Sequence, residues 1–367
     1  MHKLGATGRK TSVIVLGAGI SGLSTALALL KRGHGVTLFD RGKAGGESSW
    51  AGGGILSPLL PWDYPEPVST LALRSMKMYA DWVADIETQS GRIAEYWRCG
   101  MHVLGMSQPD SALAWCKAHG LTVHLGHTDA DDRLWLPEIA QVRNPRLVAA
   151  LRETVVRLGG IIHTDRTAEA ATTQARRVVA ISTAQGTLAA DQFVLATGAW
   201  AGTALPGLTG VPNIRPIRGQ MLLFKLEPGV LDTILYRNGL YLIPRRDGHV
   251  LVGSTLEDAG FDKSTDAATH QRLHAEAAEL LPILADARPV RHWAGLRPGS
   301  PDNIPVIDRH PDFDNVFVNA GHYRYGVTMA PASAELLLDL MEGSPTALDP
   351  APYRWQAALV RRWTEAL

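Results

Sequence analysis

The stretch VIVLGAGISGLSTALALLKRGHGVTLFD, residues 13–40, predicts how the chain begins to fold. Residues 13–16 are an apolar run of strand length, residues 20–31 have a helical pattern that ends at Gly33, and residues 36–39 are a second apolar run. A basic last turn followed by glycine is a common helix ending. The order strand, glycine turn, helix, strand is typical of the βαβ unit that opens a parallel sheet.

Three glycines of this stretch, Gly17, Gly19 and Gly22, form the pattern GxGxxG at the turn between strand and helix. The first allows a tight turn, the second lets the backbone approach a pyrophosphate, and the third lets the helix pack against the strand. Asp40 ends the second strand, where a carboxylate can accept hydrogen bonds from ribose hydroxyls and would repel a 2′-phosphate. The unit therefore predicts a site for NAD or FAD rather than NADP, with the phosphates facing the helix N-terminus.

The composition narrows the class of protein. The 367 residues are enough for two domains, and the balance of 36 basic and 36 acidic side chains argues against nucleic acid as a partner. Cys99 and Cys116 cannot form a disulfide scaffold, and the histidine and cysteine spacings predict no metal site. Residues 13–30 are uncharged, but glycines and serines divide them into a strand and a helix, so we expect neither a signal peptide nor membrane association. The cytoplasm is the default location.

The rest of the chain combines two kinds of pattern. One kind of pattern continues the parallel α/β sheet. It predicts helices at 69–89, 144–158 and 330–341 and strands at 161–163, 193–196 and 316–318. A hairpin at 178–193, antiparallel strands between 214 and 256 and a helix at 266–281 are predicted between these elements. Residues 57–67 contain four prolines and predict a rigid surface loop, and residues 90–143 are irregular.

Four further motifs accompany the first βαβ unit. They are WAGLRPG at 293–299, GHYRYG at 321–326, SSWAGGG at 48–54 and YLIPR at 241–245, and a strand running into Ala-Thr-Gly-Ala ends at residue 199. Together these motifs resemble the D-amino-acid oxidase superfamily of FAD-dependent oxidoreductases, and within it the glycine oxidase branch. The resemblance extends from about residue 12 to residue 341, nearly the whole chain, with the motifs in the family's order.

The resemblance implies a fold class and a division into domains. The fold is expected to be α/β, with a Rossmann-like FAD-binding domain and an interleaved α+β substrate-binding domain built on an antiparallel sheet. The FAD-binding domain is expected to comprise residues 1–86, 144–205 and 303–367, the last with a C-terminal tail. The substrate-binding domain is expected to comprise residues 87–143 and 206–302.

The resemblance also implies a substrate site built from three side chains. An arginine at the position of Arg297 grips the substrate carboxylate with a bidentate fork, and a tyrosine at the position of Tyr241 adds a hydroxyl to the same group. Arg324 would be a second contact on the substrate side. From the residues alone, Arg297 could be a surface arginine in a proline-rich turn and Tyr241 a packing residue of a sheet.

The cofactor positions implied by the resemblance are spread over the chain. They are Gly17, Gly19, Ile20, Ser21, Gly22, Asp40, Arg41, Ser48, Ser49, Gly53, Gly54, Ile55, Thr167, His322, Tyr323, Arg324, Tyr325, Gly326, Val327 and Thr328. Thr167 is matched to the residue that lines the adenine, and His322 is placed beside the isoalloxazine without an acid–base role. The N-terminus of the last helix would direct its partial positive charge at the flavin pyrimidine.

Two departures from the family pattern are informative. Relatives with covalent flavin attach it through a histidine in the N-terminal loop or a late cysteine, whereas here Trp50 occupies the loop and no cysteine follows Cys116. We therefore expect FAD to be bound non-covalently. Gly239 and Leu256 replace other residues at expected pocket positions, so the detailed shape of the substrate site is left open.

The activity implied by the resemblance is oxidative deamination of glycine and other small amines or amino acids, such as sarcosine and D-alanine. Hydride transfer to the flavin would give an oxo acid such as glyoxylate, ammonia or an amine, and hydrogen peroxide from molecular oxygen. The branch implies a role in thiamine thiazole biosynthesis and assembly as a homotetramer. Two alternatives stay open: a D-amino-acid or sarcosine dehydrogenase that passes electrons to a quinone or carrier, and a non-catalytic dinucleotide-binding subunit.

Overall fold

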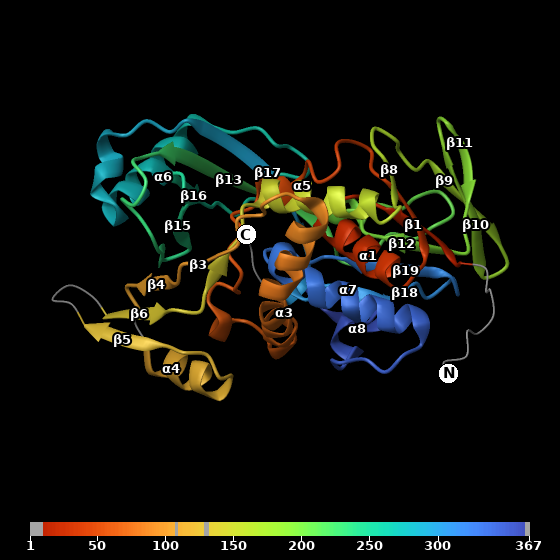
Figure 1. Ribbon diagram of the computed structural model, residues 1–367, viewed down its shortest axis with the longest axis horizontal. Helices are drawn as coiled ribbons and strands as arrows, with labels where there is room; N and C mark the ends of the chain where they lie inside the picture. Colours follow the sequence, from red (N-terminus) through yellow and green to blue (C-terminus); the bar gives the residue numbers. More distant parts are fainter. Residues whose placement is uncertain (1–9, 107–108, 128–131, 364–367) are drawn as a thin grey trace.

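The computed structural model describes residues 10–106, 109–127 and 132–363 (Figure 1). In this part of the chain, two large sheets form the framework. One has six strands in the order β18-β19-β12-β1-β2-β8, and the other has eight in the order β17-β13-β16-β15-β14-β4-β6-β5. The six-stranded sheet lies in the right half of Figure 1 and the eight-stranded sheet in the left half.

The six-stranded sheet is parallel except at one edge, where β18 runs antiparallel to β19. Its strands are β1 (Ser12–Leu16), β2 (Gly35–Phe39), β8 (Ile161–His163), β12 (Gln192–Leu195), β18 (Val306–Arg309) and β19 (Val316–Ala320). Alternate side chains of β1 pack on opposite faces, as the pleat of a strand requires. Val13 and Val15 join the core shared with the helices, and Ile14 and Leu16 join the core on the other face. Because both faces are covered, β1 is a continuous apolar run.

Helices cover one face of this sheet, and a small sheet covers the other. The helical face carries α1 (Ile20–Lys31), α3 (Glu66–Ser90), α5 (Asn144–Arg157) and α7 (Gly326–Glu342). The opposite face carries β9 (Ala170–Gln174), β10 (Arg177–Thr183), β11 (Gly186–Ala189) and α8 (Trp355–Val360). The predicted hairpin therefore forms, but it belongs to this three-stranded sheet.

The eight-stranded sheet is antiparallel except where β14 runs parallel to β4. Its strands are β4 (Met101–Leu104), β5 (His124–His127), β6 (Asp132–Leu136), β13 (Arg215–Lys225), β14 (Ile234–Arg237), β15 (Leu240–Pro244), β16 (His249–Gly253) and β17 (Arg291–Gly299). Helix α6 (Ala267–Leu280) packs on β13, β15 and β16 through a buried apolar cluster. The antiparallel strands predicted between residues 214 and 256 are thus present.

Short elements connect these layers. They are α2 (Ser48–Ala51), α4 (Pro109–Ala118), a two-stranded sheet of β3 (Trp97–Arg98) and β7 (Ala140–Gln141), and the 3-10 helices η1 (Pro61–Asp63), η2 (Gly198–Trp200), η3 (Pro282–Asp286), η4 (Pro301–Asn303) and η5 (Ala351–Tyr353). Within the described ranges, no helix combines the length and the apolar character needed to cross a membrane.

The last long helix differs from the prediction, because α7 begins at Gly326 rather than near residue 330 and contains Pro331 inside it. A proline at this position has no N–H to donate to the carbonyl of Val327, four residues earlier. The hydroxyl of Tyr79 donates to that carbonyl at 3.0 Å, and the hydroxyl of Ser75 accepts the N–H of Ala332 at 3.1 Å. Side chains of α3 therefore replace the missing helix hydrogen bonds, which allows α7 to extend toward the loop before it.

The surface loop predicted at residues 57–67 is wrong for the first part of that segment. Ser57, Leu59 and Pro61 are buried, whereas Asp63, Pro65 and Glu66 are exposed. The segment therefore packs against the protein at its start and faces solvent at its end. Helix α5 begins at Asn144, the first residue of the predicted range 144–158, and its cap position is Arg143.

The chain crosses between the two large sheets several times. The six-stranded sheet takes strands from residues 12–39, 161–195 and 306–320, and the eight-stranded sheet takes strands from residues 101–136 and 215–299. This order follows the predicted alternation of segments. The exact domain boundaries at residues 86, 143, 205 and 302 stay a prediction.

Candidate functional site

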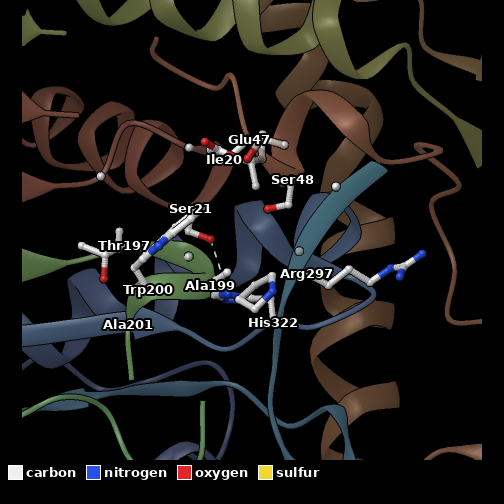
Figure 2. Close-up of a pocket in the computed structure, with 18 of the residues that line it drawn as sticks. Ile20, Ser21, Glu47, Ser48, Thr197, Ala199, Trp200, Ala201, Arg297 and His322 are labelled. Atoms are coloured by element: carbon white, nitrogen blue, oxygen red, sulfur yellow. Dashed lines mark hydrogen bonds between the residues drawn. The ribbon is translucent and has the colours of Figure 1, made fainter. Parts of the chain in front are cut away.

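A cavity of about 430 Å³ is lined by residues from both large sheets, the loop around α2 and the start of α7. In Figure 2, Thr197 and Trp200 lie on one side of it and Arg297 on the other. The predicted residues that line it are Gly17, Gly19, Ile20, Ser21, Asp40, Arg41, Ser48, Ser49, Gly53, Gly54, Ile55, Thr167, Tyr241, Arg297, His322, Tyr323, Arg324, Tyr325, Gly326, Val327 and Thr328. Segments that are more than 300 residues apart in the sequence therefore meet at one site.

Gly22 is the predicted cofactor residue that does not line the cavity. A Cβ atom there would lie 1.9 Å from the carbonyl oxygen of Gly17, so α1 packs directly on the turn that precedes it. Gly17 itself has a φ of +102°, and a Cβ there would lie 2.3 Å from the carbonyl oxygen of Ala196. These contacts explain why glycine is required at two positions of the GxGxxG pattern, since any side chain there would clash. The turn therefore presents bare backbone where it borders the cavity.

The end of β2 presents Asp40 to the cavity. One carboxylate oxygen accepts the N–H of Ala18 at 2.9 Å, and the other accepts the N–H of Gly42 at 2.9 Å. Burial raises the pKa of Asp40, and these backbone hydrogen bonds oppose that rise. Because each carboxylate oxygen has more than one lone pair, the fixed carboxylate can still accept hydrogen bonds from a ribose.

The N-terminus of α1 borders the same cavity. The hydroxyl of Ser49 accepts the N–H of Ile20, the first helical residue, at 2.9 Å. Ser49 belongs to α2, and Ser48 of that helix also lines the cavity. The loop thus holds hydroxyl groups at a helix N-terminus, where the partial positive charge of the helix favours phosphate groups.

Another part of the cavity wall is the turn that follows β12, which adjoins the glycine turn. Thr197, Gly198, Ala199 and Trp200 all line the cavity, which places the predicted Ala-Thr-Gly-Ala turn beside it. The Arg41 guanidinium lies 3.3 Å from the centroid of the Trp200 ring. Sequence reasoning missed Trp200, although its position directly after the turn was a usable signal.

The guanidinium of Arg297, on β17, is held by three oxygen atoms. It donates to the Ser254 hydroxyl at 2.6 Å, to the Thr255 carbonyl at 3.1 Å and to the Arg218 carbonyl at 3.4 Å. All three acceptors are neutral, and the described residues include no carboxylate within ion-pair distance of Arg297. Burial lowers the pKa of Arg297 from that of a free arginine, but such a side chain stays charged at neutral pH. The site therefore contains a fixed positive charge without a protein counter-ion.

Tyr241 lies next to this arginine. Its hydroxyl donates to the same Ser254 hydroxyl at 3.0 Å, so Ser254 joins the two predicted substrate residues. A Cβ atom on Gly53 would approach the Tyr241 ring to 3.3 Å, which places the glycine loop against it. Ser254 was missed by sequence reasoning, because a serine after a strand carries no motif of its own.

The second predicted arginine begins a chain of hydroxyl contacts. Arg324 donates to the Tyr64 hydroxyl at 3.2 Å, and the Tyr64 hydroxyl hydrogen-bonds that of Tyr325. The Tyr325 hydroxyl in turn donates to the carbonyl of Leu59 at 3.0 Å. The described residues show no carboxylate paired with Arg324 either, so Arg297 and Arg324 are two arginines of the cavity lining without a carboxylate partner. Tyr64 was also missed, since it lies in the segment expected to be a surface loop.

His322 lines the cavity and is buried, with both ring nitrogens near serine hydroxyls of two helices. Its Nε2 lies 3.0 Å from the Ser333 hydroxyl on α7, and its Nδ1 lies 3.4 Å from the Ser21 hydroxyl on α1 (Figure 2). Burial lowers the pKa of His322 to about 4. The ring is therefore neutral at physiological pH and connects the start of α1, at Ser21, to Ser333 in the middle of α7.

Several expected features lie outside this cavity. Gly239 and Leu256 do not line it, and neither do Trp50, Cys99 and Cys116. The two cysteines are thus not placed to form a thioether, as expected for non-covalent FAD. Over the described ranges, no three His, Cys, Asp or Glu side chains are grouped closely enough to hold a metal ion.

The cavity fits a long dinucleotide with a substrate at one end. The glycine turn, the α1 N-terminus and Asp40 suit an adenosine diphosphate. The N-terminal residues of α7, Gly326 to Thr328, line the cavity near the arginines and suit the electron-rich end of a flavin. Fold and site thus define an oxidoreductase that binds a dinucleotide.

Comparisons with known proteins give the family. The sequence profile described as FAD dependent oxidoreductase matches residues 12–340. The glycine oxidase of Pseudomonas aeruginosa is 41% identical over 93% of this chain and 97% of its own length. The bifunctional protein ThiO/ThiG of Synechocystis is 33% identical over 90% of this chain and 51% of its own length. The crystal structure of glycine oxidase from Geobacillus kaustophilus superposes with a TM-score of 0.87, at 26% identity, covering 95% of this chain and 99% of that one.

The chain belongs to the FAD dependent oxidoreductase family, and its cofactor is FAD.

Proposed function

We propose that this chain oxidises the amino group of glycine and of other small amino acids or amines, such as sarcosine and D-alanine, with molecular oxygen as electron acceptor. The observation that carries the proposal is Arg297, a cation in the FAD cavity that meets only neutral protein oxygens. The glycine oxidases of Pseudomonas aeruginosa and Pseudomonas putida, 41% and 40% identical, support the choice of substrate class.

Arg297 would bind the substrate carboxylate, because a charge-assisted hydrogen bond to a carboxylate is stronger than one to a neutral oxygen. Ser254 accepts hydrogen bonds from both Arg297 and Tyr241, which aligns the two side chains toward one ligand. Gripping the carboxylate at a fixed place orients the neighbouring Cα–H bond, and orientation is the main contribution that the protein makes in a cofactor enzyme.

The reacting amine must be neutral to release a hydride, and the cavity has no obvious side chain to deprotonate it. Among the described lining residues, the carboxylates are Asp40 and Glu47. Both belong to the part of the cavity formed by the end of β2 and the loop after it, away from Arg297. His322 is neutral and engaged by Ser21 and Ser333. We therefore infer that the substrate loses its proton to water before or during binding.

Bound FAD would supply the hydride acceptor and the route of the electrons to oxygen, with hydrogen peroxide as the product. The chain contributes the first turn of α7, where unpaired backbone N–H groups place partial positive charge beside the cavity. His322 joins α7 to α1 through its contacts with Ser333 and Ser21.

The wider biological setting is part of the same proposal. A role in making the thiazole of thiamine is supported by the ThiO/ThiG protein of Synechocystis. The match covers 51% of the length of that protein. A cytoplasmic location is the default for a sequence in which we expect no signal peptide, and a homotetrameric assembly rests on the family resemblance alone.

The test is to mix the purified FAD-containing protein with glycine, sarcosine and D-alanine in air and to measure peroxide and oxo acid. Peroxide production would support the oxidase. Flavin bleaching under argon without peroxide in air would indicate a dehydrogenase that uses another acceptor. A flavin that stays oxidised with every amine under argon would indicate a non-catalytic subunit.

A further inference from the structure

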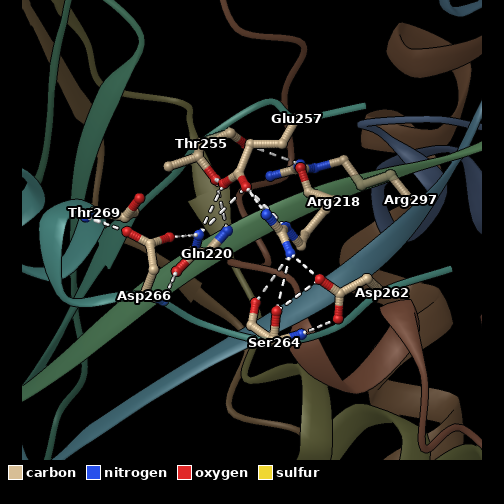
Figure 3. Close-up of polar contacts among 9 residues, drawn as sticks. All are labelled: Arg218, Gln220, Thr255, Glu257, Asp262, Ser264, Asp266, Thr269 and Arg297. Carbon is tan, nitrogen blue, oxygen red and sulfur yellow. Dashed lines mark hydrogen bonds and ion pairs between the residues drawn. The ribbon is translucent and has the colours of Figure 1, made fainter. Parts of the chain in front are cut away.

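A cluster of polar side chains lies directly behind Arg297, away from the cavity (Figure 3). We call it the Gln220 cluster, and it consists of Arg218, Gln220, Thr255, Glu257, Asp262 and Asp266. Of these residues, none lines the FAD cavity. The cluster is joined to Arg297 through the backbone, because the carbonyls of Arg218 and Thr255 accept hydrogen bonds from its guanidinium.

Gln220 is the buried centre of this cluster. Its side chain is 0% exposed, and its amide nitrogen donates to Glu257 at 3.0 Å and to Asp266 at 2.8 Å. Its amide oxygen accepts the backbone N–H of Asp266 at 3.3 Å. A buried amide with all these contacts can hold β13, the 255–257 segment and the start of α6 in one arrangement.

The 255–257 segment is attached to β13 at several points. The backbone N–H of Gln220 donates to the Thr255 hydroxyl at 2.9 Å, and that hydroxyl donates to Glu257. The backbones of Arg218 and Glu257 exchange two hydrogen bonds, at 2.9 and 3.0 Å. The two carbonyls that contact Arg297 therefore belong to backbone that the cluster holds in place.

Arg297 also lies flat against this backbone. A Cβ atom on Gly219 would lie 2.1 Å from its Nη1, so the guanidinium occupies the space above the residue between Arg218 and Gln220. A small displacement of β13 would therefore move the guanidinium itself.

The carboxylates of the Gln220 cluster bind groups other than Arg297. Glu257 is paired with Arg218, and Asp262 is paired with the same arginine at 2.6 Å. Burial alone would raise the pKa of Glu257, but hydrogen bonds from Thr255, Arg218 and Gln220 lower it below its ordinary value. Hydrogen bonds from Gln220 and Thr269 lower the pKa of Asp266 to about 2. The cluster is thus ionised at neutral pH, and its negative charges are directed at Arg218 and Gln220 instead of Arg297.

We propose that Gln220 is a positioning residue for carboxylate binding: it ties Glu257 and Asp266 to β13, so that Arg297 is held by neutral carbonyls and keeps its charge for a small carboxylate ligand. This inference rests on the proposed function only for the identity of the ligand. It predicts that changes at Gln220 weaken carboxylate binding although the side chain does not touch the ligand.

The test compares two variants of the full-length, FAD-loaded protein with a matched control. Gln220→Met removes the amide at nearly constant volume, and Gln220→Glu adds a carboxyl group beside two carboxylates. Asn315→Leu is the control, because Asn315 is a buried amide with three hydrogen bonds to Val178 and Asp191, outside the cavity. Calorimetric titration with acetate measures carboxylate binding without turnover, and Arg297→Met reports how much of it depends on the arginine.

Gln220→Met should weaken acetate binding about tenfold, the change that corresponds to 1.4 kcal/mol, while Asn315→Leu should lose thermal stability and keep its acetate affinity. Gln220→Glu should be impaired at pH 8.5 and recover toward wild type at pH 6. A carboxyl group between two carboxylates has a raised pKa, and its protonated form can donate one of the two hydrogen bonds that the glutamine amide donates. This pH-dependent recovery is a signature that a general loss of folding would not produce.

Other results would overturn the inference. These are unchanged acetate affinity in Gln220→Met, equal losses in Asn315→Leu, a Gln220→Glu defect that does not depend on pH, or acetate binding that is absent from wild type or insensitive to Arg297→Met. Failure of the proposed function would look different. In that case no amino acid would be oxidised, while acetate binding would still depend on both Arg297 and Gln220.

Discussion

The hydroxyl of Tyr325 hydrogen-bonds both backbone groups of Leu59, accepting the N–H at 3.1 Å and donating to the carbonyl at 3.0 Å. Leu59 lies in the proline-rich segment, and Tyr325 immediately precedes α7. This contact joins a segment from the first fifth of the chain to the loop before α7, at the border of the cavity. The Tyr325 hydroxyl also hydrogen-bonds that of Tyr64, which accepts a hydrogen bond from Arg324.

Tyr325→Phe should destabilise the protein by about 1–3 kcal/mol, because it leaves backbone groups of Leu59 buried without a partner. The KM for amino acids should rise as well, since Tyr64 and Arg324 lose their support. Urea unfolding and steady-state kinetics measure the two effects. Tyr96→Phe is the control, because the Tyr96 hydroxyl has no hydrogen-bond partner among the described residues. Equal stability of the two variants would contradict this role for Tyr325.

Arg297→Met should lower kcat/KM for glycine at least tenfold, since a hydrogen bond to a charged group contributes about 1.5–3 kcal/mol. Folding and FAD content should be little changed, because the guanidinium contacts only neutral oxygens. Arg291→Met is a matched control on the same strand, where the side chain is exposed and outside the cavity. Unchanged kcat/KM in Arg297→Met would rule out the carboxylate role.

Gly22→Ala should destabilise the protein by about 1–3 kcal/mol through overpacking and weaken FAD binding. The added Cβ would lie 1.9 Å from the Gly17 carbonyl and would push α1 away from the turn. Gly35→Ala should be tolerated, because the nearest atom to its added Cβ is 4.0 Å away. Thermal unfolding and FAD titration of the apoprotein compare the two. Similar FAD affinity in both would show that close packing of α1 is not required.

His322 should make the protein less stable as the pH falls. Its pKa is about 4 in the folded chain, against 6.5 for an unperturbed histidine, so the unfolded chain binds the proton first. The stability that this histidine contributes is present above pH 6.5 and is lost as the pH falls toward 4. The loss between pH 7.5 and pH 5 should be about 2 kcal/mol.

The check on His322 is the free energy of unfolding at pH 7.5 and pH 5 in wild type and in His322→Gln. The variant should lack this part of the pH dependence, because glutamine does not titrate. If both proteins lose the same free energy between the two pH values, the histidine is not buried as described.

Local sequence determined the first βαβ unit, since α1 begins at Ile20 and ends at Lys31 as its pattern predicted. Here the apolar periodicity, the glycine turn and the helix end all predict the same strand and helix boundaries. Contacts between residues close in sequence suffice to specify this unit. The motif around Arg297 was recognisable for the same reason, because its residues are consecutive. The proline-rich segment was misjudged, because prolines specify stiffness and not whether a segment faces solvent.

By itself, then, the sequence determined the first βαβ unit, the dinucleotide turn and the family, all of which are written in short runs of neighbouring residues. It did not determine the short strands and the helix between residues 90 and 143. Only the tertiary structure decided that Ser254 joins Tyr241 to Arg297, that Tyr64 joins Arg324 to Tyr325, and that Gln220 lies behind the site. These partners come from separate segments of the chain. Their meeting depends on how the sheets pack and on which buried polar groups need each other, and no local pattern records that.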